Sequence, residues 1–282
     1  NDYRNFVISG WWMDCKIIKI FFFIFLTSIN VDAVEFDGKF RQGHFIIGKT
    51  MPEAKIFIDK KKIKVSKEGY FAFGISKDRK YDITIVEKIN DQSNTIVKKI
   101  IGRKYKIQKI DGLPKKKVTP PEEFYERINN ENKLIGEARK INTDLSFFKE
   151  KFIFPVDNAI ITGVYGSQRI LNGIPKWPHY GLDFAQKKGT PVKAMNNGIV
   201  TLSENDLYYT GGTIIFDHGH GVSTLYMHMD KIFVKVGDHV KKGDVVGTVG
   251  ETGRATGPHL DIRLNWFGER LDPMSVLENK WD

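Results

Sequence analysis

The sequence predicts a mainly β protein in which a short helical segment joins two β-rich parts. Three observations predict this class. Short runs rich in Ile, Phe, Tyr and Val alternate with turn signals over residues 34–112. A segment suited to a helix follows at about 120–141, and Gly-rich, closely spaced strand runs fill residues 148–282. The chain is 41% hydrophobic and 28% charged, an ordinary globular mixture in which general disorder is not expected.

Residues 1–33 are predicted to be upstream sequence followed by a signal peptide that starts at Met13. An apolar, Phe-rich run at 17–29 follows positive charge, and small residues then precede a cleavage point after Ala33. The run is shorter than the ~20 apolar residues of a membrane-spanning helix, so we expect cleavage, with an uncleaved anchor as the alternative. The single cysteine, Cys15, precedes the cut. We therefore expect a cysteine-free periplasmic or cell-envelope protein that contacts the membrane only through its signal peptide.

Residues 34–112 predict a β-sandwich of about seven strands. Apolar runs occur at 44–48, 54–59, 61–66, 70–75 and 81–89, with turn signals between them. The strand rhythm and the placement of glycine resemble those of immunoglobulin-like modules. This part has no cluster of catalytic residue types, and His44 is expected to be structural.

Residues 113–147 predict a basic linker and a helix. Lysine and proline crowd the stretch 112–120, which is typical of a linker. Glu122 and Glu123 then suit the first turn of a helix that runs to about residue 141. Tyr125, Ile128 and Leu134 are expected to share one face of this helix loosely, together with Ile135.

The net charge of +10 indicates an anionic partner. Nucleic acid, a membrane surface and an acidic cell-wall polymer all meet this requirement. No groove-reading motif accompanies the charge, so nucleic acid is not expected.

The first chemical motif is His179-Tyr-Gly-Leu-Asp183, which pairs two good zinc ligands. In an extended strand, residues four apart lie roughly 13 Å from each other. Two donor atoms on one ion lie only ~3–3.5 Å apart. The backbone must therefore bend between the two ligands, and Gly181 allows such a bend.

The second motif is Leu-Tyr-Met-His-Met at 225–229. Strand alternation predicts Tyr226 and His228 on one face, with Leu225, Met227 and Met229 facing the core on the other. By itself, His228 could be an ordinary strand histidine.

The third motif is a Gly-rich loop followed by a strand, at 250–264. Its residues alternate between two faces, with Leu260, Ile262 and Leu264 on one and His259, Asp261 and Arg263 on the other. Spacing by two brings His259 and Asp261 within reach of one centre. An Asp261–Arg263 ion pair on a solvated face is the alternative, and such a pair stabilises little.

In this order the motifs H-x-x-x-D, Y-x-H and T-G-x-x-T-G-P-H-L-x resemble those of the LytM/lysostaphin-type zinc endopeptidases, over about residues 150–277. The resemblance implies a LytM-type domain built on an antiparallel sheet or partly open barrel. It implies that one zinc ion is bound by His179, Asp183 and Asp261, while His228 and His259 flank the metal-bound water as base or oxyanion stabiliser. The chain departs from the family at Asp261, where the family has histidine.

Two functions follow from the resemblance. The first is a secreted zinc metalloendopeptidase that hydrolyses the peptide cross-links of peptidoglycan. The alternative, motivated by Asp261, is a catalytically degenerate envelope protein that binds the cell wall or activates another wall hydrolase as its partner. A lipoyl-like carrier barrel over 189–200 and 232–249 ranks last, because it leaves the spaced His and Asp residues without a role. His218, His220 and His239 are expected to be structural or exposed.

Overall fold

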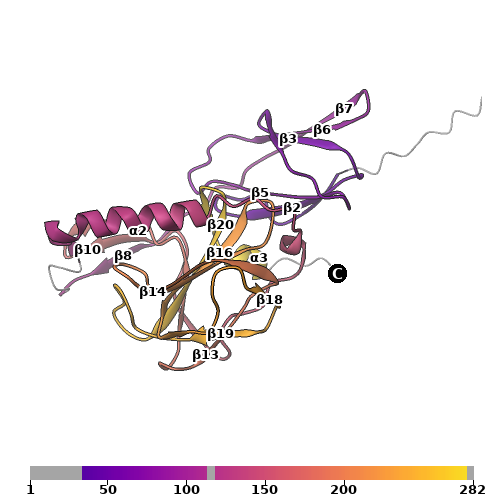
Figure 1. The fold of residues 1–282 in the computed structure, drawn as a ribbon. Coiled ribbons are helices and arrows are strands. Elements are labelled where there is room, and N and C mark those ends of the chain that lie inside the picture. The colour runs from indigo at the N-terminus through magenta and orange to yellow at the C-terminus, as the bar shows by residue number, and fades with distance from the viewer. Residues whose placement is uncertain (1–33, 113–117, 278–282) are drawn as a thin grey trace, which may run out of the picture. The chain divides into compact units, whose positions relative to one another are not determined.

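Strands dominate the chain, as the sequence predicts (Figure 1). The structure is a computed structural model that describes residues 34–112 and 118–277. The predicted signal peptide therefore lies outside the described residues, and its cleavage stays a prediction. Among the residues that are described, no helix has both the length and the apolar character needed to cross a membrane.

The N-terminal part contains seven strands in two antiparallel sheets. One sheet has the order β1-β2-β5 and the other β4-β3-β6-β7. Their bounds are β1 Glu35–Asp37, β2 Phe45–Lys49, β3 Lys55–Ile58, β4 Lys61–Ile63, β5 Tyr70–Gly74, β6 Ile83–Ile89 and β7 Gln92–Lys98. Alternate residues of β6 are buried, as a strand with one core-facing side requires. Residues 34–112 also contain an eighth strand, Ile107–Ile110, outside these two sheets. The sandwich and its likeness to immunoglobulin modules stay predictions.

The largest sheet lies in the C-terminal part and is antiparallel throughout. Its strand order is β18-β14-β15-β16-β20-β12-β9, and β21 pairs with β20. The bounds are β9 Ile160–Gly163, β12 Leu182–Ala185, β14 Gly198–Leu207, β15 Gly211–Asp217, β16 Val222–Met229, β18 His239–Val240, β20 His259–Trp266 and β21 Glu269–Leu271. A small sheet of β13 (Pro191–Lys193), β19 (Val245–Thr248) and β17 (Lys231–Ile232) accompanies it, and the helix α3 (Met274–Leu277) follows β21.

One strand from the end of the N-terminal part joins a strand of the C-terminal part. Strand β8 (Ile107–Ile110) pairs in parallel with β10 (Gln168–Leu171), which also pairs with β11 (Ile174–Pro175). The parallel pair joins residues about sixty positions apart, so it needs a long crossover connection. The domain boundary predicted at residue 112 therefore assigns β8 and its pairing partner β10 to different parts of the chain.

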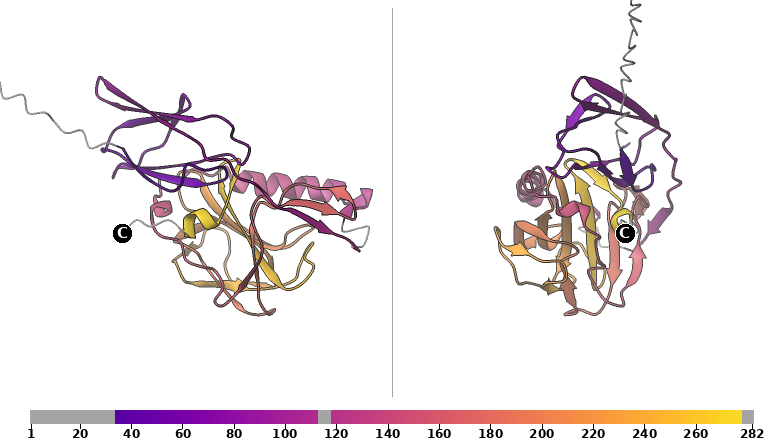
Figure 2. Two further views of the ribbon diagram at one scale, coloured as in Figure 1. Left: turned by 180° about the vertical axis from the view of Figure 1, so that it is seen from behind. Right: turned by 90° about the vertical axis from the view of Figure 1, so that its right-hand side faces the viewer.

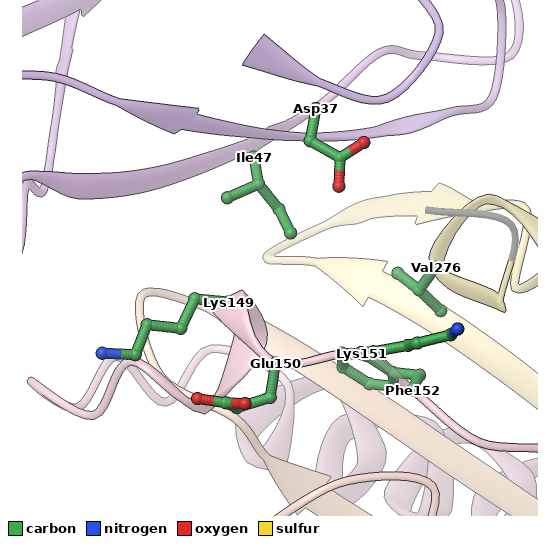
Figure 3. A pocket seen from close by; sticks show the side chains of 7 residues that line it. All are labelled: Asp37, Ile47, Lys149, Glu150, Lys151, Phe152 and Val276. Carbon is green, nitrogen blue, oxygen red and sulfur yellow. The ribbon is translucent and has the colours of Figure 1, made fainter. Parts of the chain in front are cut away.

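The two β-rich parts share one hydrophobic core. Phe45 and Phe73 belong to the same buried cluster as Leu264 and Leu271. Polar contacts join the same surfaces, including the ion pair of Arg103 with Asp272 at 2.5 Å. Between them lies a cavity of only about 10 Å³, lined in part by Ile47 and Val276 (Figure 3). A space of this size holds at most about one water molecule, so this contact is close-packed.

The predicted helix forms as the short helix η1 (Glu122–Phe124) followed by α2 (Tyr125–Ala138), while a second short helix, η2 (Phe147–Lys149), precedes β9. Ala138 and Ile135 of α2 pack with Leu225 and Met227 in a second apolar cluster. Leu202 and Leu207 of β14 belong to the same cluster, so the helix lies against β14 (Figure 1). Figure 2 shows the helix from two further directions. The expected apolar face was partly wrong, because the side chains of Tyr125 and Leu134 are exposed.

His218 is a structural histidine, as expected. It is fully buried, with Nδ1 2.7 Å from the carbonyl oxygen of Asn197 and Nε2 2.8 Å from the hydroxyl of Thr224. The neutral ring satisfies both contacts, because Nδ1–H donates to the carbonyl and Nε2 accepts from the hydroxyl. His220 is also buried and His239 is exposed.

Acidification below pH 6.5 is expected to destabilise the fold through His218. Burial lowers the pKa of His218 from 6.5 to about 4. Between these pH values His218 is protonated in the unfolded chain but neutral in the folded protein. The free energy of unfolding should therefore fall as pH falls through this window, by up to about 1.4 kcal/mol per pH unit. Urea unfolding at pH 7, 6, 5 and 4 measures the slope. For a His218→Gln variant this slope should be smaller by up to about 1.4 kcal/mol per pH unit, which corresponds to one proton. Equal slopes for the two proteins would show that His218 does not cause the pH dependence.

Candidate functional site

Two neighbouring strands place the two aspartates side by side. Asp183 of β12 lies directly opposite Asp261 of β20 in the antiparallel register. Leu260, Ile262 and Leu264 belong to the main core, which confirms the predicted alternation of β20. Asp261 consequently points to the other face of the sheet, as the sequence predicts.

His179, Asp183 and Asp261 converge as a potential ligand set. His179 Nε2 lies 3.0 Å from Asp183 Oδ1 and 3.4 Å from Asp261 Oδ2. One donor atom from each residue lies within 4.8 Å of the others. Donor atoms on a tetrahedral zinc ion are ~3.3 Å apart for bonds near 2 Å, so the two shorter distances suit a shared ion.

Burial and unsatisfied atoms also fit a cation at this position. His179, Asp183 and Asp261 are only 2%, 8% and 3% exposed. Oδ1 of Asp261 and Nδ1 of His179 are buried without a hydrogen-bond partner, and the one close polar contact of the buried Oδ1 of Asp183 in the described residues is with the ring of His179. Unsatisfied buried acceptors are costly, and a bound metal ion would satisfy the two carboxylate oxygens. The donor set of imidazole and carboxylates is one that zinc accepts.

Two glycines make room for the ligand carboxylates. A Cβ atom at Gly181 would lie 2.0 Å from Oδ1 of Asp261, and one at Gly163 would lie 2.0 Å from Oδ2 of Asp183. Because Gly181 has no side chain, the carboxylate of Asp261 can lie close to its backbone. This role adds to the bend that the sequence predicted at Gly181.

Gly181→Ala is expected to disrupt the site while leaving the fold largely intact. The added methyl group must displace the Asp261 carboxylate or the backbone oxygen of Ile262, which would lie 2.8 Å away. We expect zinc affinity to fall about 10-fold or more, the range seen when ligand-orienting contacts are lost. Titration with zinc against a chelator measures this. Gly102→Ala is the matched control, because a Cβ at Gly102 meets nothing within 4 Å. Equal zinc affinities for the two variants would refute the steric role of Gly181.

Each aspartate also pairs with an arginine. Arg169 lies 3.2 Å from Asp183 Oδ2, and Arg263 lies 3.2 Å from Asp261 Oδ2. Burial acts to raise the pKa of Asp261, but Arg263 and His179 outweigh it and hold that pKa well below its ordinary value. The Asp261–Arg263 pair expected on a solvated face therefore exists, but Asp261 is buried in it.

His228 and His259 lie together beside the ligand set. Their ring centroids are 4.8 Å apart, and His259 Nε2 lies 4.0 Å from Asp183 Oδ1. Nδ1 of His228 is 2.8 Å from the carbonyl oxygen of Thr252, and Nδ1 of His259 is 2.8 Å from that of Gly257. Each Nδ1 therefore carries the proton of the neutral ring, and each Nε2 is the unprotonated nitrogen. Burial, the main cause, lowers the pKa of His228 to about 4.

The predicted alternation of β16 was wrong at its end. Tyr226 and Met229 both lie in the main core, while Leu225 and Met227 lie in the second apolar cluster. The register with β15 shifts between Gly212 and Ile214, opposite this point. His228 has a φ of 63°, a rare conformation for a residue other than glycine. This local irregularity reverses the phase of the strand and places His228 beside His259.

Thr252 is a supporting residue that the motifs did not reveal. Its carbonyl accepts from His228, its hydroxyl donates to the carbonyl of Met229 at 2.9 Å, and that hydroxyl accepts from the amide of Gly212 at 2.9 Å. Thr252 thus joins both strands of the irregularity to the loop before β20. The turn sequence Gly-Glu-Thr-Gly predicted a loop there, but long-range contacts of this kind leave no local signal.

Comparison with known proteins places these residues in a family context. Residues 177–273 match the profile of peptidase family M23. The chain is 37% identical over 125 residues to the peptidoglycan DD-endopeptidase ShyA of Vibrio cholerae, covering 44% of this chain and 29% of ShyA. It is 40% identical over 112 residues to lysostaphin of Staphylococcus simulans, covering 38% of this chain and 23% of lysostaphin. The match thus spans less than a third of either relative.

A solved structure resembles the chain over a longer range. A crystal structure of a protein from Pseudomonas aeruginosa, assigned to the M23 peptidases, superimposes with a TM-score of 0.65 at 26% identity. The match covers 85% of this chain and 95% of that protein. The similarity therefore extends well beyond the 97 residues of the family profile, which run from 177 to 273.

Proposed function

We propose that this chain is a zinc metalloendopeptidase that hydrolyses peptide cross-links of bacterial peptidoglycan, because residues 177–273 match the model of peptidase family M23. The convergence of His179, Asp183 and Asp261 on one point carries the proposal. The names of ShyA and lysostaphin support the substrate class and a location in the cell envelope, reached through the predicted signal peptide.

In this proposal His179, Asp183 and Asp261 bind one zinc ion. When bound, zinc supplies Lewis-acid polarisation of the scissile carbonyl and lowers the pKa of water. Arg169 bonds Oδ2 of Asp183 and leaves Oδ1, which lies 3.0 Å from His179 Nε2, free to face an ion. Arg263 bonds Oδ2 of Asp261, the same oxygen that lies 3.4 Å from His179 Nε2, and so orients this carboxylate. The arginines also offset the negative charge of two carboxylates, so an aspartate in the third ligand position need not weaken the cation's effect on substrate.

His228 and His259 are the catalytic residues in this proposal. Each has its Nδ1 proton bonded to a backbone carbonyl, so each offers an unprotonated Nε2 towards the site. One ring can accept a proton from water, and one can donate a hydrogen bond to the oxyanion once it is protonated. Because burial lowers the pKa of His228 to about 4, its ring remains a proton acceptor throughout the neutral range.

The test combines metal analysis with cleavage of a defined substrate. Purified protein, residues 34–282, should contain about one zinc and release peptides from cross-linked muropeptides. A chelator should abolish release, and zinc should restore it. His259→Ala should retain zinc but cleave at least ~100-fold more slowly, which is the scale of lost acid–base catalysis. Absence of cleavage with every divalent metal tested would refute the proposal.

The aspartate at 261 motivates the second candidate, a non-enzymatic envelope protein that binds the wall or activates a wall hydrolase. In that case wild-type protein would bind peptidoglycan without cleaving it, and Asp261→His would create no activity. Binding would also survive His179→Ala. Loss of a measured hydrolytic activity in His179→Ala would exclude this candidate.

A further inference from the structure

Positive charge exceeds negative charge around the candidate metal site. Arg169 and Arg263 are each matched by a ligand aspartate. Three more arginines, Arg139, Arg254 and Arg270, interact with this pair. Burial and repulsion by Arg263 lower the pKa of all three, and Arg169 also acts on Arg254. Five arginines against two aspartates leave three positive charges unbalanced, and a zinc ion would add two more.

Arg254 and Arg270 have no acidic partner within the described part of the chain. Both instead stack on tyrosine rings. The guanidinium of Arg254 lies 4.4 Å from the ring centre of Tyr209, and that of Arg270 lies 4.6 Å from the ring centre of Tyr180. Each guanidinium lies close to its ring, and Arg270 also hydrogen-bonds the side chain of Tyr180. An arginine has five N–H donors, so N–H groups remain on both that can bind a ligand. Neighbouring groups desolvate part of each side chain, but both residues keep surface that is exposed to solvent, so a ligand can reach them.

The two stacks flank the catalytic groups along the chain. Tyr180 directly follows the ligand His179. Tyr209 precedes Thr210, whose carbonyl accepts from the amide of His228 at 2.8 Å, and the amide of Arg254 donates to the carbonyl of Tyr209 at 2.9 Å. Arg270 therefore contacts the residue that follows His179, and Arg254 is bonded to the segment that holds His228.

We propose that Arg254 and Arg270 form a carboxylate-binding subsite for the substrate peptide. Planar guanidinium groups bind carboxylates through paired, charge-assisted hydrogen bonds, and the unbalanced positive charge around them favours an anion. The preferred substrate is thus a peptide with free carboxylates near the scissile bond. This inference rests on the proposed peptidase function, and it specifies which substrates the same site accepts.

The experiment uses zinc-loaded protein, a cross-linked muropeptide with free carboxylates, and the same muropeptide with its carboxyl groups amidated. Wild type should cleave the free form with a KM at least ~10-fold lower than that of the amidated form, as expected for charge-assisted hydrogen bonds. Arg254→Gln combined with Arg270→Gln should raise the KM of the free form about 10-fold or more. The variant should leave kcat and the cleavage of the amidated form nearly unchanged. Lysine at both positions should recover part of the affinity.

Lys88→Gln is the matched control, because Lys88 also lies over an aromatic ring, 5.3 Å from the centre of Phe57, but in the N-terminal sheet. It should leave both values of KM unchanged. Calorimetric binding of the two muropeptides, measured in parallel, tests the subsite without turnover. Equal affinity of wild type for both forms, or an equal loss on both forms in the double variant, would overturn the subsite. Cleavage of neither form would count against the peptidase function, and the binding comparison would still decide the subsite.

Discussion

Asp261→Ala is expected to lower zinc affinity by at least ~100-fold and to abolish hydrolysis. Loss of a single ligand-orienting partner commonly costs 10–100-fold in metal affinity, and loss of a ligand should exceed that range. Asp261 is the residue best placed to show this, because it is buried, pairs with Arg263, and lies opposite Asp183 in the sheet. Zinc content after dialysis and competition against a chelator measure the affinity.

The companion variants separate loss of a ligand from loss of the fold. Asp261→His replaces one zinc ligand with another, so it should retain zinc. Asp217→Asn is the matched control, because Asp217 is also buried but bonds to Thr143 and to the amide of Gly219 outside the site. It should leave zinc affinity unchanged. Full zinc binding by a folded Asp261→Ala protein would show that Asp261 is not a ligand.

Arg263→Gln is expected to destabilise the metal-free protein more than the zinc-loaded protein. Removing one partner of a buried ion pair leaves an uncompensated charge, which costs about 3–5 kcal/mol when both partners are buried. The side chains of Arg263 and Asp261 are 27% and 5% exposed, so we expect a smaller loss of about 2–3 kcal/mol without metal. Zinc would supply the missing positive charge, so the loss should shrink when zinc is bound.

Urea unfolding with a chelator and with excess zinc measures both losses. Lys193→Gln is the control, because the Lys193–Asp157 pair has side chains 32% and 68% exposed and should contribute less than about 1 kcal/mol. In an Asp261→His background, Arg263→Gln should cost less, since the carboxylate is gone. An equal loss with and without zinc would mean that Arg263 acts only through packing.

The residues that the sequence predicted best are those whose role follows from local spacing. The strand alternation at 260–264 holds because one face of β20 packs into the core, and a one-residue slip would bury Asp261 there. The bend at Gly181 was predictable for a similar reason, since two ligands four residues apart cannot meet along a straight strand.

The failures of the sequence analysis involve contacts between distant segments. The alternation of β16 reverses at His228, which has a positive φ. The ring of His228 bonds to the carbonyl of Thr252, 24 residues away in sequence. Leu134 and Ile135 were both expected on the packed face of α2. Leu134 is exposed, while Ile135 packs there with Ala138, which was not predicted. Arg254 lies in the loop of the third motif, and Arg270 lies outside all three motifs. No role was predicted for either, because their aromatic partners lie far from them in sequence.

The pairing of β8 with β10 means that the unit of homology and the unit of folding differ in this protein. The match to the family model begins at residue 177. However, the amide of His179 donates to the carbonyl of Ser167, which lies outside that match. Strand β10, which begins at the next residue, Gln168, pairs in parallel with residues 107–110. A fragment that contained only residues 177–273 would lack Ser167, β8 and β10. The segment around His179 would then lose the backbone contacts that hold it on its N-terminal side. Comparative work on this part of the chain should therefore use the longer segment. A protease cut near β8 should also disturb the candidate ligand His179, although the cut lies far from it in sequence.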